Sequence, residues 1–349
     1  MPQGNNSRSR LESSQFNNIR LQPIGAFADR LQALSCSILF WHLMFSKIHS
    51  VAQQVNQIVV GKEHQVRQAL VCLLAGGHLL IEDVPGVGKT TLAHALALSL
   101  GLQFNRVQFT SDLLPADVIG VSVFDRDTSA FVFHPGPIFT QVLLGDEINR
   151  ATPKTQSALL EAMEERQVSS DGVTRDLPQP FFVIATQNPT HQIGTFQLPE
   201  SQLDRFLMCL SLGYPDVAAE RALLMGEDRR SMLKSLPTAM QPQELITART
   251  ALTTIHTSDK LIDYVHALVL ASRRNGMFQD GMSPRAAIAL VQASRAWAAL
   301  EGRDHVIPED VQSVLIPVVA HRLRPLKSSS GAALASRDLV AQMLKSVAV

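Results

Sequence analysis

Several residue classes are scarce in this 349-residue chain, and each scarcity excludes a class of protein. There are three cysteines (Cys36, Cys72 and Cys209) and no CxxC pair, which argues against a disulfide framework or a zinc site. No run approaches the roughly 20 apolar residues of a membrane helix. Lys and Arg (31) balance Asp and Glu (31), so the chain lacks the overall basic character typical of nucleic-acid binding. We therefore expect a cytoplasmic protein without membrane insertion.

The apolar residues that are present, 46% of the chain, divide it into three regions. Residues 1–50 open with Ser, Asn, Gln and Arg, which predicts a disordered or loosely structured N-terminal extension. An alternative is an arm around Leu39–Trp41 that binds a partner or touches a membrane. In residues 51–213 short apolar runs alternate with helical periodicity, which predicts a parallel sheet covered by helices. In residues 214–349 the strand signal disappears, so only helices are predicted.

The predicted elements follow from apolar spacing and from Gly and Pro punctuation. Strands are predicted at residues 79–83, 104–109, 141–144, 181–186 and 207–212. Helices are predicted at residues 51–59, 62–74, 91–100, 153–165, 217–225, 261–273, 284–300 and 308–321.

A glycine-rich segment lies between the first predicted strand and a helix, as a phosphate-binding loop requires. It reads Asp83, Val84, Pro85, Gly86, Val87, Gly88, Lys89, Thr90, Thr91. Gly86 and Gly88 leave room for backbone N–H groups to surround phosphates, and the helix N-terminus adds positive charge. Lys89 is expected to reach the β- and γ-phosphates of ATP, and Thr90 to bind Mg²⁺. Asp83 occupies the position where the GxxxxGK[ST] pattern has glycine.

Polar residues follow two later strands. Asp146 and Glu147 end an apolar strand: Asp146 suits Mg²⁺, and Glu147 is predicted to polarise the attacking water. Asn188 follows the next strand and is predicted to orient that water and sense the γ-phosphate. Arg205 precedes the last strand and is predicted to act on the γ-phosphate of a neighbouring subunit. Arg285 opens a later helix, and we expect it to reach back to the same nucleotide.

Taken together, these segments resemble the MoxR group of AAA+ ATPases from about Val55 to about Arg322. The resemblance rests on residues 59–63, 84–90, 112–115, 134–139, 145–151, 159–165, 185–189, 198–200, 202–206 and 283–286.

The resemblance implies an α/β fold: a P-loop AAA+ αβα core with a parallel sheet, followed by a small all-helical lid domain. ATP would lie between them, with Val60 and Gly61 near the adenine. Lys89 and Thr90 match Walker A, and Asp146 and Glu147 match Walker B. By the same likeness, Asn188 is sensor 1, Arg205 a trans-acting arginine finger and Arg285 the sensor 2 arginine.

The resemblance also implies hairpins at residues 121–133 and 167–180 that face the pore of a ring. The Asp171-Gly172 pair is a hairpin signal in its own right.

The implied function is that of an ATP-hydrolysing chaperone that remodels, assembles or activates a partner protein or metalloenzyme complex. The implied assembly is a homo-oligomer, a hexameric ring, acting with a von Willebrand factor A domain protein. Three alternatives use similar motifs: a magnesium-chelatase-type ATPase subunit, a nucleic-acid motor or loader, and a non-hydrolysing nucleotide switch. The neutral charge argues against the motor, and the Asp146–Glu147 pair with Arg205 argues against the switch.

Overall fold

The computed structural model describes residues 41, 43–188, 194–226, 229–274, 276–326 and 336–348. The chain divides into two units, residues 1–42 and residues 43–349. The predicted N-terminal extension therefore lies almost entirely outside the described residues. Its predicted end at residue 50 is wrong, because residues 43–58 are helical, with Met44 and Ile48 buried. These two continue the apolar stripe of Val51 and Val55, while the polar residues between them lie toward solvent.

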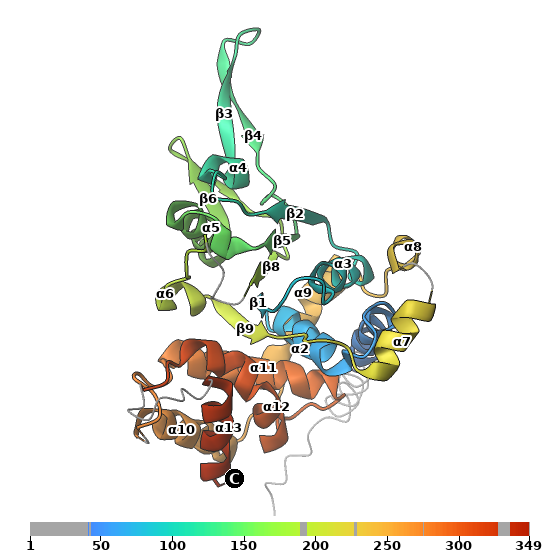
Figure 1. Ribbon diagram of the computed structural model, residues 1–349, viewed down its shortest axis with the longest axis vertical. Coiled ribbons are helices and arrows are strands. Elements are labelled where there is room, and N and C mark those ends of the chain that lie inside the picture. The colour runs from blue at the N-terminus through green and yellow to red at the C-terminus, as the bar shows by residue number, and fades with distance from the viewer. Residues whose placement is uncertain are drawn as a thin grey trace, which may run out of the picture. The chain divides into compact units, whose positions relative to one another are not determined.

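Five parallel strands form the central sheet, as predicted, and the structure places them in the order β2-β5-β8-β1-β9 (Figure 1). The strands are β1 (His78–Glu82), β2 (Phe104–Gln108), β5 (Val142–Asp146), β8 (Phe182–Gln187) and β9 (Phe206–Leu210). The three central strands β5, β8 and β1 are apolar along nearly their whole length because both of their faces are covered. Since all strands run the same way, the residues that follow them gather at one edge of the sheet.

Helices and short turns connect these strands. They are α2 (Glu63–Leu74), α3 (Lys89–Ser99), α4 (Pro115–Ile119), η1 (Ile148–Arg150), α5 (Pro153–Glu165) and α6 (Glu200–Leu203). Helix α2 packs against β1 and β9, and α3 against β5. Helix α5 begins with Pro at its first position after the N-cap Thr152, as predicted. The α/β architecture predicted from the sequence is confirmed.

Two antiparallel hairpins project from this core, also as predicted. One pairs β3 (Gly120–Asp125) with β4 (Ala130–Pro135), and the other pairs β6 (Gln167–Ser170) with β7 (Val173–Asp176). They contact each other where the Arg175 guanidinium lies 3.8 Å from the centre of the Phe133 ring. Near the tip of the first hairpin, the rings of Phe124 and Phe131 contact each other edge to face, with centroids 5.4 Å apart, yet remain 51% and 74% exposed. This pair presents an apolar surface at the tip.

The described chain after residue 213 is helical, again as predicted. It contains α7 (Val217–Met225), α8 (Arg229–Lys234), α9 (Pro242–Ala251), η2 (Leu252–Thr254), α10 (Asp259–Arg274), α11 (Pro284–Leu300), α12 (Pro308–Val319), η3 (Ala320–Arg322) and α13 (Ser336–Ser346). The α11 helix packs on α12 and α2, and α12 packs on β9 (Figure 1). The predicted division between domains at residue 213 stays a prediction. None of the described helices is long and apolar enough to cross a bilayer.

Candidate functional site

The glycine-rich segment forms the loop between β1 and α3. Gly86 and Gly88 have φ angles of 86° and 96°, which disfavour residues with a Cβ, and a Cβ at either position would meet no atom within 4 Å. The loop thus encloses open space at the N-terminus of α3. Backbone N–H groups at a helix N-terminus bind phosphate, so this cradle fits a nucleotide phosphate.

Lys89, the first residue of α3, is 9% exposed. Its Nζ donates to the backbone oxygen of Asp83 at 2.8 Å and lies 3.5 Å from Oδ1 of Asn188. Burial lowers the pKa of Lys89, against the opposing pull of three carboxylates, those of Asp83, Asp146 and Glu147. A buried ammonium held mainly by neutral oxygens gains from an additional anion, such as a phosphate.

Asp83, the departure from the glycine-first pattern, has a structural explanation. One carboxylate oxygen accepts the N–H of Val84 at 2.8 Å, and the other accepts the N–H of Gly213 at 2.6 Å and the hydroxyl of Ser211 at 3.1 Å. The side chain therefore joins the start of the loop to the segment that follows β9. Neither of these contacts could be made by glycine.

The two acidic residues predicted after the strand lie together at the carboxyl edge of the sheet. Asp146 Oδ1 accepts the hydroxyl of Thr186 at 3.0 Å, and Oδ2 accepts Arg106 at 2.7 Å. Glu147 has a left-handed backbone (φ 56°), and its N–H donates to the same Thr186 oxygen at 3.0 Å. Asp146 and Glu147 are thus fixed by a single hydroxyl on the neighbouring strand.

The Glu147 carboxylate has two further partners. Asn188 Nδ2 donates to it at 3.2 Å, and Arg150 Nε lies 2.7 Å away. Asn188 and Glu147, which were predicted to act on the same water, are therefore hydrogen-bonded to each other, and their roles stay predictions. Sequence reasoning missed Arg106, Arg150 and Thr186. The i,i+3 spacing could have indicated Arg150, whereas Arg106 and Thr186 depend on which strands are neighbours.

Magnesium fits the donors at this edge. Thr90 and Asp146 offer the oxygen atoms that Mg²⁺ prefers. No group of three or more His, Cys, Asp and Glu residues gathers for a metal in the described chain, so the protein alone does not build a cage. Mg²⁺ characteristically takes one or two protein ligands and completes its shell with substrate phosphates and water. The predicted pair is consistent with that mode.

Val60 and Gly61 form the turn before α2, beside the beginning of the helical region. A Cβ on Gly61 would lie 2.6 Å from that of Ala219 in α7, so only glycine fits this approach. The neighbouring Lys62 donates to the backbone oxygen of Tyr214 at 2.6 Å. Gly213, which contacts Asp83, directly precedes Tyr214. The turn is therefore linked to the phosphate loop through the segment after β9.

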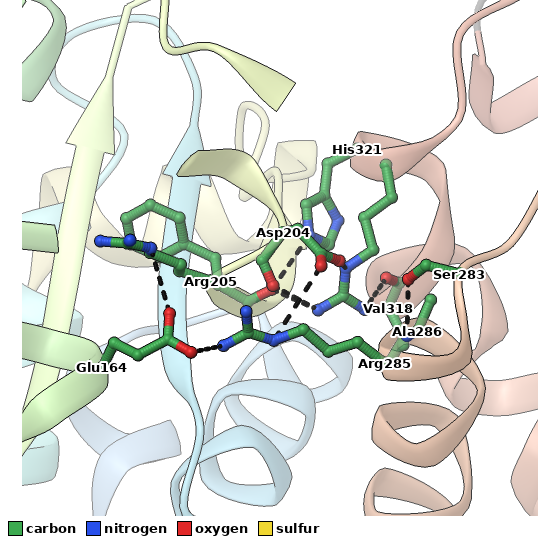
Figure 2. Close-up of polar contacts among 10 residues, drawn as sticks. Glu164, Asp204, Arg205, Ser283, Arg285, Ala286, Val318 and His321 are labelled. Carbon is green, nitrogen blue, oxygen red and sulfur yellow. Dashed lines mark hydrogen bonds and ion pairs between the residues drawn. The ribbon is translucent and has the colours of Figure 1, made fainter. Parts of the chain in front are cut away.

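The two predicted arginines meet at a different place (Figure 2). The Glu164 carboxylate lies between them, 3.1 Å from Nε of Arg205 and 2.8 Å from Nη2 of Arg285. Asp204 lies 3.9 Å from Arg285 and 2.9 Å from Arg322. Sequence reasoning did not anticipate the roles of Glu164 and Arg322 in this cluster.

This arginine cluster lies at the amino edge of the sheet. Arg205 immediately precedes β9, and Glu164 follows Met163, whose oxygen lies 3.1 Å from Nε2 of His78, the first residue of β1. The phosphate loop follows the other end of β1. A strand of this length separates the two edges by roughly 15 Å. The packing of α11 thus places Arg285 beside Arg205 and at the other edge of the sheet from the phosphate loop of its own chain. The expectation that Arg285 reaches the same nucleotide as Arg205 stays a prediction.

Two of the three cysteines lie in the part of the chain that the structure describes. Cys72 and Cys209 are free and buried. Burial raises the pKa of both thiols, that of Cys209 to about 12, so neither has thiolate character at neutral pH. Cys36 lies outside the described residues.

Comparison with known proteins places this geometry among ATPases. Residues 78–208 match the family model for the ATPase family associated with various cellular activities (AAA), and residues 270–342 match an AAA lid domain. The chain is similar to the uncharacterised protein YeaC of Bacillus subtilis, with 42% identity over 85% of this chain and 93% of the relative. It is similar to chaperone MoxR1 of Mycobacterium tuberculosis, with 39% identity over 80% and 76% of the two chains. A crystal structure described as an ATPase from Cytophaga hutchinsonii superposes with a TM-score of 0.81 at 33% identity, over 91% of this chain and 98% of that one.

Proposed function

Since the chain belongs to the MoxR family of AAA+ ATPases, we propose that it hydrolyses ATP to ADP and phosphate at sites completed by a second copy of itself. The observation that supports this proposal is that two clusters of functional residues lie at opposite edges of the sheet. Lys89, Glu147 and Asn188 lie at the carboxyl edge of the sheet, and Arg205 and Arg285 lie at its amino edge. A strand length of roughly 15 Å separates the two edges, which favours action of these arginines on the nucleotide of another copy.

In this proposal the loop from Val84 to Thr91 holds the phosphates through backbone N–H groups, and Lys89 neutralises their charge. Thr90 and Asp146 would hold Mg²⁺, which when bound stabilises negative charge on the phosphate oxygens. Glu147 accepts a proton from the attacking water, and Asn188 orients the Glu147 carboxylate and that water. Val60 and Gly61 form the side of the site toward the adenine.

Arg205 and Arg285 would act on the nucleotide of an adjacent subunit. The Glu164 carboxylate holds the two guanidinium groups together, which offsets their mutual repulsion and keeps both oriented toward one side. Such a pair can stabilise charge that develops on the transferred phosphoryl group. A head-to-tail contact of this kind forms a ring when the rotation between copies closes. We propose a hexameric ring, as the family resemblance implies.

The work done by the ring is the remodelling, assembly or activation of a partner protein or metalloenzyme complex. The exposed apolar side chains of the β3–β4 hairpin, Phe124 and Phe131, support this part of the proposal, because they could grip an apolar segment of a client. A von Willebrand factor A domain protein is the proposed partner, on the strength of the family resemblance alone.

The test is ATP hydrolysis by the full chain, with its mass measured by light scattering with and without ATP. We expect magnesium-dependent turnover and an ATP-dependent increase in mass. Lys89→Ala should abolish ATP binding and both effects, whereas Lys154→Ala, at an exposed position on α5, should change neither. An absence of turnover and of assembly in the wild type, with ATP bound, would exclude the hydrolytic proposal in favour of a nucleotide switch.

A further inference from the structure

A second cavity contains arginine residues for which the ATPase reaction provides no role. It has a volume of about 380 Å³ and lies between α2, the end of α5, α9 and α11. Its lining includes Arg166 after α5, Arg249 on α9 and Arg295 on α11, and no carboxylate is present among its lining residues. It adjoins the cavity beside Arg205 and Arg285, with which it shares Gly76, Arg166 and Gln292.

In the described chain, these three arginines lack the ion pairs that the arginines of the adjoining cluster form. None of them takes part in an ion pair among the described residues. Arg249 Nε donates to the backbone oxygen of Leu73 at 3.0 Å, and Arg295 Nε donates to the hydroxyl of Thr257 at 3.0 Å. These contacts fix the direction of both guanidinium groups.

Arg249 in particular has an unsatisfied donor. Its Nη2 is buried and has no hydrogen-bond partner. A buried charged donor without an acceptor is costly, and such a group in a folded protein calls for an acceptor, an ion or a water molecule. Burial, with the nearby charge of Arg166, lowers the pKa of Arg249 to about 10, which is consistent with an environment that lacks an anion.

We propose that this cavity binds a small phosphate-bearing anion. Guanidinium groups bind phosphate oxygens through paired hydrogen bonds, and three of them around one cavity match the charge of a phosphate or pyrophosphate. The cavity exceeds the size of a lone phosphate, and Leu74 and Leu252 provide an apolar wall against which the rest of a phosphorylated metabolite would pack. The site is distinct from the phosphate loop and does not depend on the proposed ATPase function.

The experiment is isothermal titration calorimetry of full-length Lys89→Ala protein, so that the phosphate loop does not contribute. Orthophosphate, pyrophosphate and AMP are titrated at constant ionic strength, which distinguishes a free anion from the phosphate of a larger molecule. We expect one site per chain, and at least tenfold weaker binding in Arg166→Gln and in Arg249→Lys. Arg126→Gln, which removes an exposed arginine from the β3–β4 turn, is the matched control and should bind normally.

Structural integrity is checked by thermal unfolding without anion, which should be the same in Arg166→Gln as in the parent because Arg166 is exposed. Crystals soaked in tungstate should show an anomalous peak between Arg166 and Arg249. The proposal is overturned if no anion binds, if the arginine variants bind as the parent does, or if Arg126→Gln weakens binding equally. It is also overturned if the variants change only the assembly mass, since the cavity would then accept an acidic side chain of a second copy.

Discussion

The two edges of the central sheet differ in which charged residues they carry and in how these residues are held. At the carboxyl edge, two carboxylates and Lys89 are held at short range by strand-end groups such as Thr186 and Asn188. At the amino edge, the guanidinium groups of Arg205 and Arg285 are partly exposed and share the carboxylate of Glu164. In the proposed function the two edges supply complementary groups for phosphoryl transfer, and this difference is the basis for proposing an active site divided between two copies.

The largest effect on ATP turnover is expected from a substitution at the amino edge. Arg205→Ala should lower ATP turnover by a factor on the order of 10³ to 10⁵ while ATP binding is retained, because the arginine acts only on charge that develops during transfer. Turnover is measured with saturating ATP, and binding with a fluorescent ATP analogue. Arg324→Ala, which removes another arginine that forms an ion pair, with Glu200, is the matched control.

A mixture of Arg205→Ala and Glu147→Gln proteins tests whether the active site is shared between subunits. Arg205→Ala subunits retain Glu147, and Glu147→Gln subunits retain Arg205, so some interfaces in a mixed ring contain both intact groups. We expect the mixture to recover part of the lost turnover. If Arg205→Ala alone hydrolyses ATP at the wild-type rate, the two edges do not form one site.

The next largest effect on ATP turnover is expected from a substitution at the carboxyl edge. Glu147→Gln should lower turnover by about 10² to 10⁴, the usual contribution of a general base, because the amide cannot accept the proton of water. ATP binding should persist, and light scattering should report a ring that stays assembled after ATP addition. Glu165→Gln, at the exposed end of α5, should leave turnover unchanged. Normal turnover in Glu147→Gln would assign the base to another residue.

The carboxyl edge could be predicted from the sequence and the amino edge could not, for a physical reason. Lys89, Asp146, Glu147 and Asn188 each follow a strand, and the ends of parallel strands meet wherever such a sheet forms. The position of Arg285 instead depends on where α11 packs, which is decided by contacts with α2 and α12 far away in sequence.

Some helices could be predicted from the sequence, and others could not. Periodicity located α5, α7 and α11 at the residues where the structure has them. Periodicity did not predict the helix over residues 43–50 or helix α13. In both of these segments, polar residues outnumber the buried apolar ones. In α13 the buried apolar residues are Leu339, Val340 and Met343. Their burial depends on the helices that pack against α13, which the local sequence does not reveal.

A third prediction concerns the pH dependence of the amino edge. Nδ1 of His78 accepts the N–H of Val183 at 3.0 Å, and Nε2 of His321 lies 3.1 Å from the oxygen of Phe206. Burial lowers the pKa of His78 to about 4 and that of His321 to about 3, whereas an unfolded histidine has a pKa near 6.5. Between pH 6.5 and 4 the unfolded state therefore binds more protons than the folded state. Stability should fall as pH decreases, by up to about 1.4 kcal/mol per pH unit for each imidazole.

Urea unfolding between pH 7 and 5 measures this slope above the range in which most carboxylates titrate. His321→Gln, whose amide can still donate to the Phe206 oxygen, should reduce the slope by one proton. His266→Gln, at an exposed position on α10, should not change it. A free energy of unfolding that stays constant from pH 6.5 to 5 would show that neither imidazole is kept neutral by the fold.

The smallest effect is expected from a substitution of Asp83, which lies at the carboxyl edge. Asp83→Gly restores the glycine-first loop pattern, yet it removes the carboxylate that accepts the N–H groups of Val84 and Gly213 and the hydroxyl of Ser211. Hydrogen bonds to a charged group contribute roughly 1.5 to 3 kcal/mol, so the free energy of unfolding in urea at pH 7 should fall by about that amount. Asp127→Gly, in the exposed β3–β4 turn, controls for the added backbone freedom of glycine. Equal stability of Asp83→Gly and wild type would mean that the loop does not need its connection to residue 213.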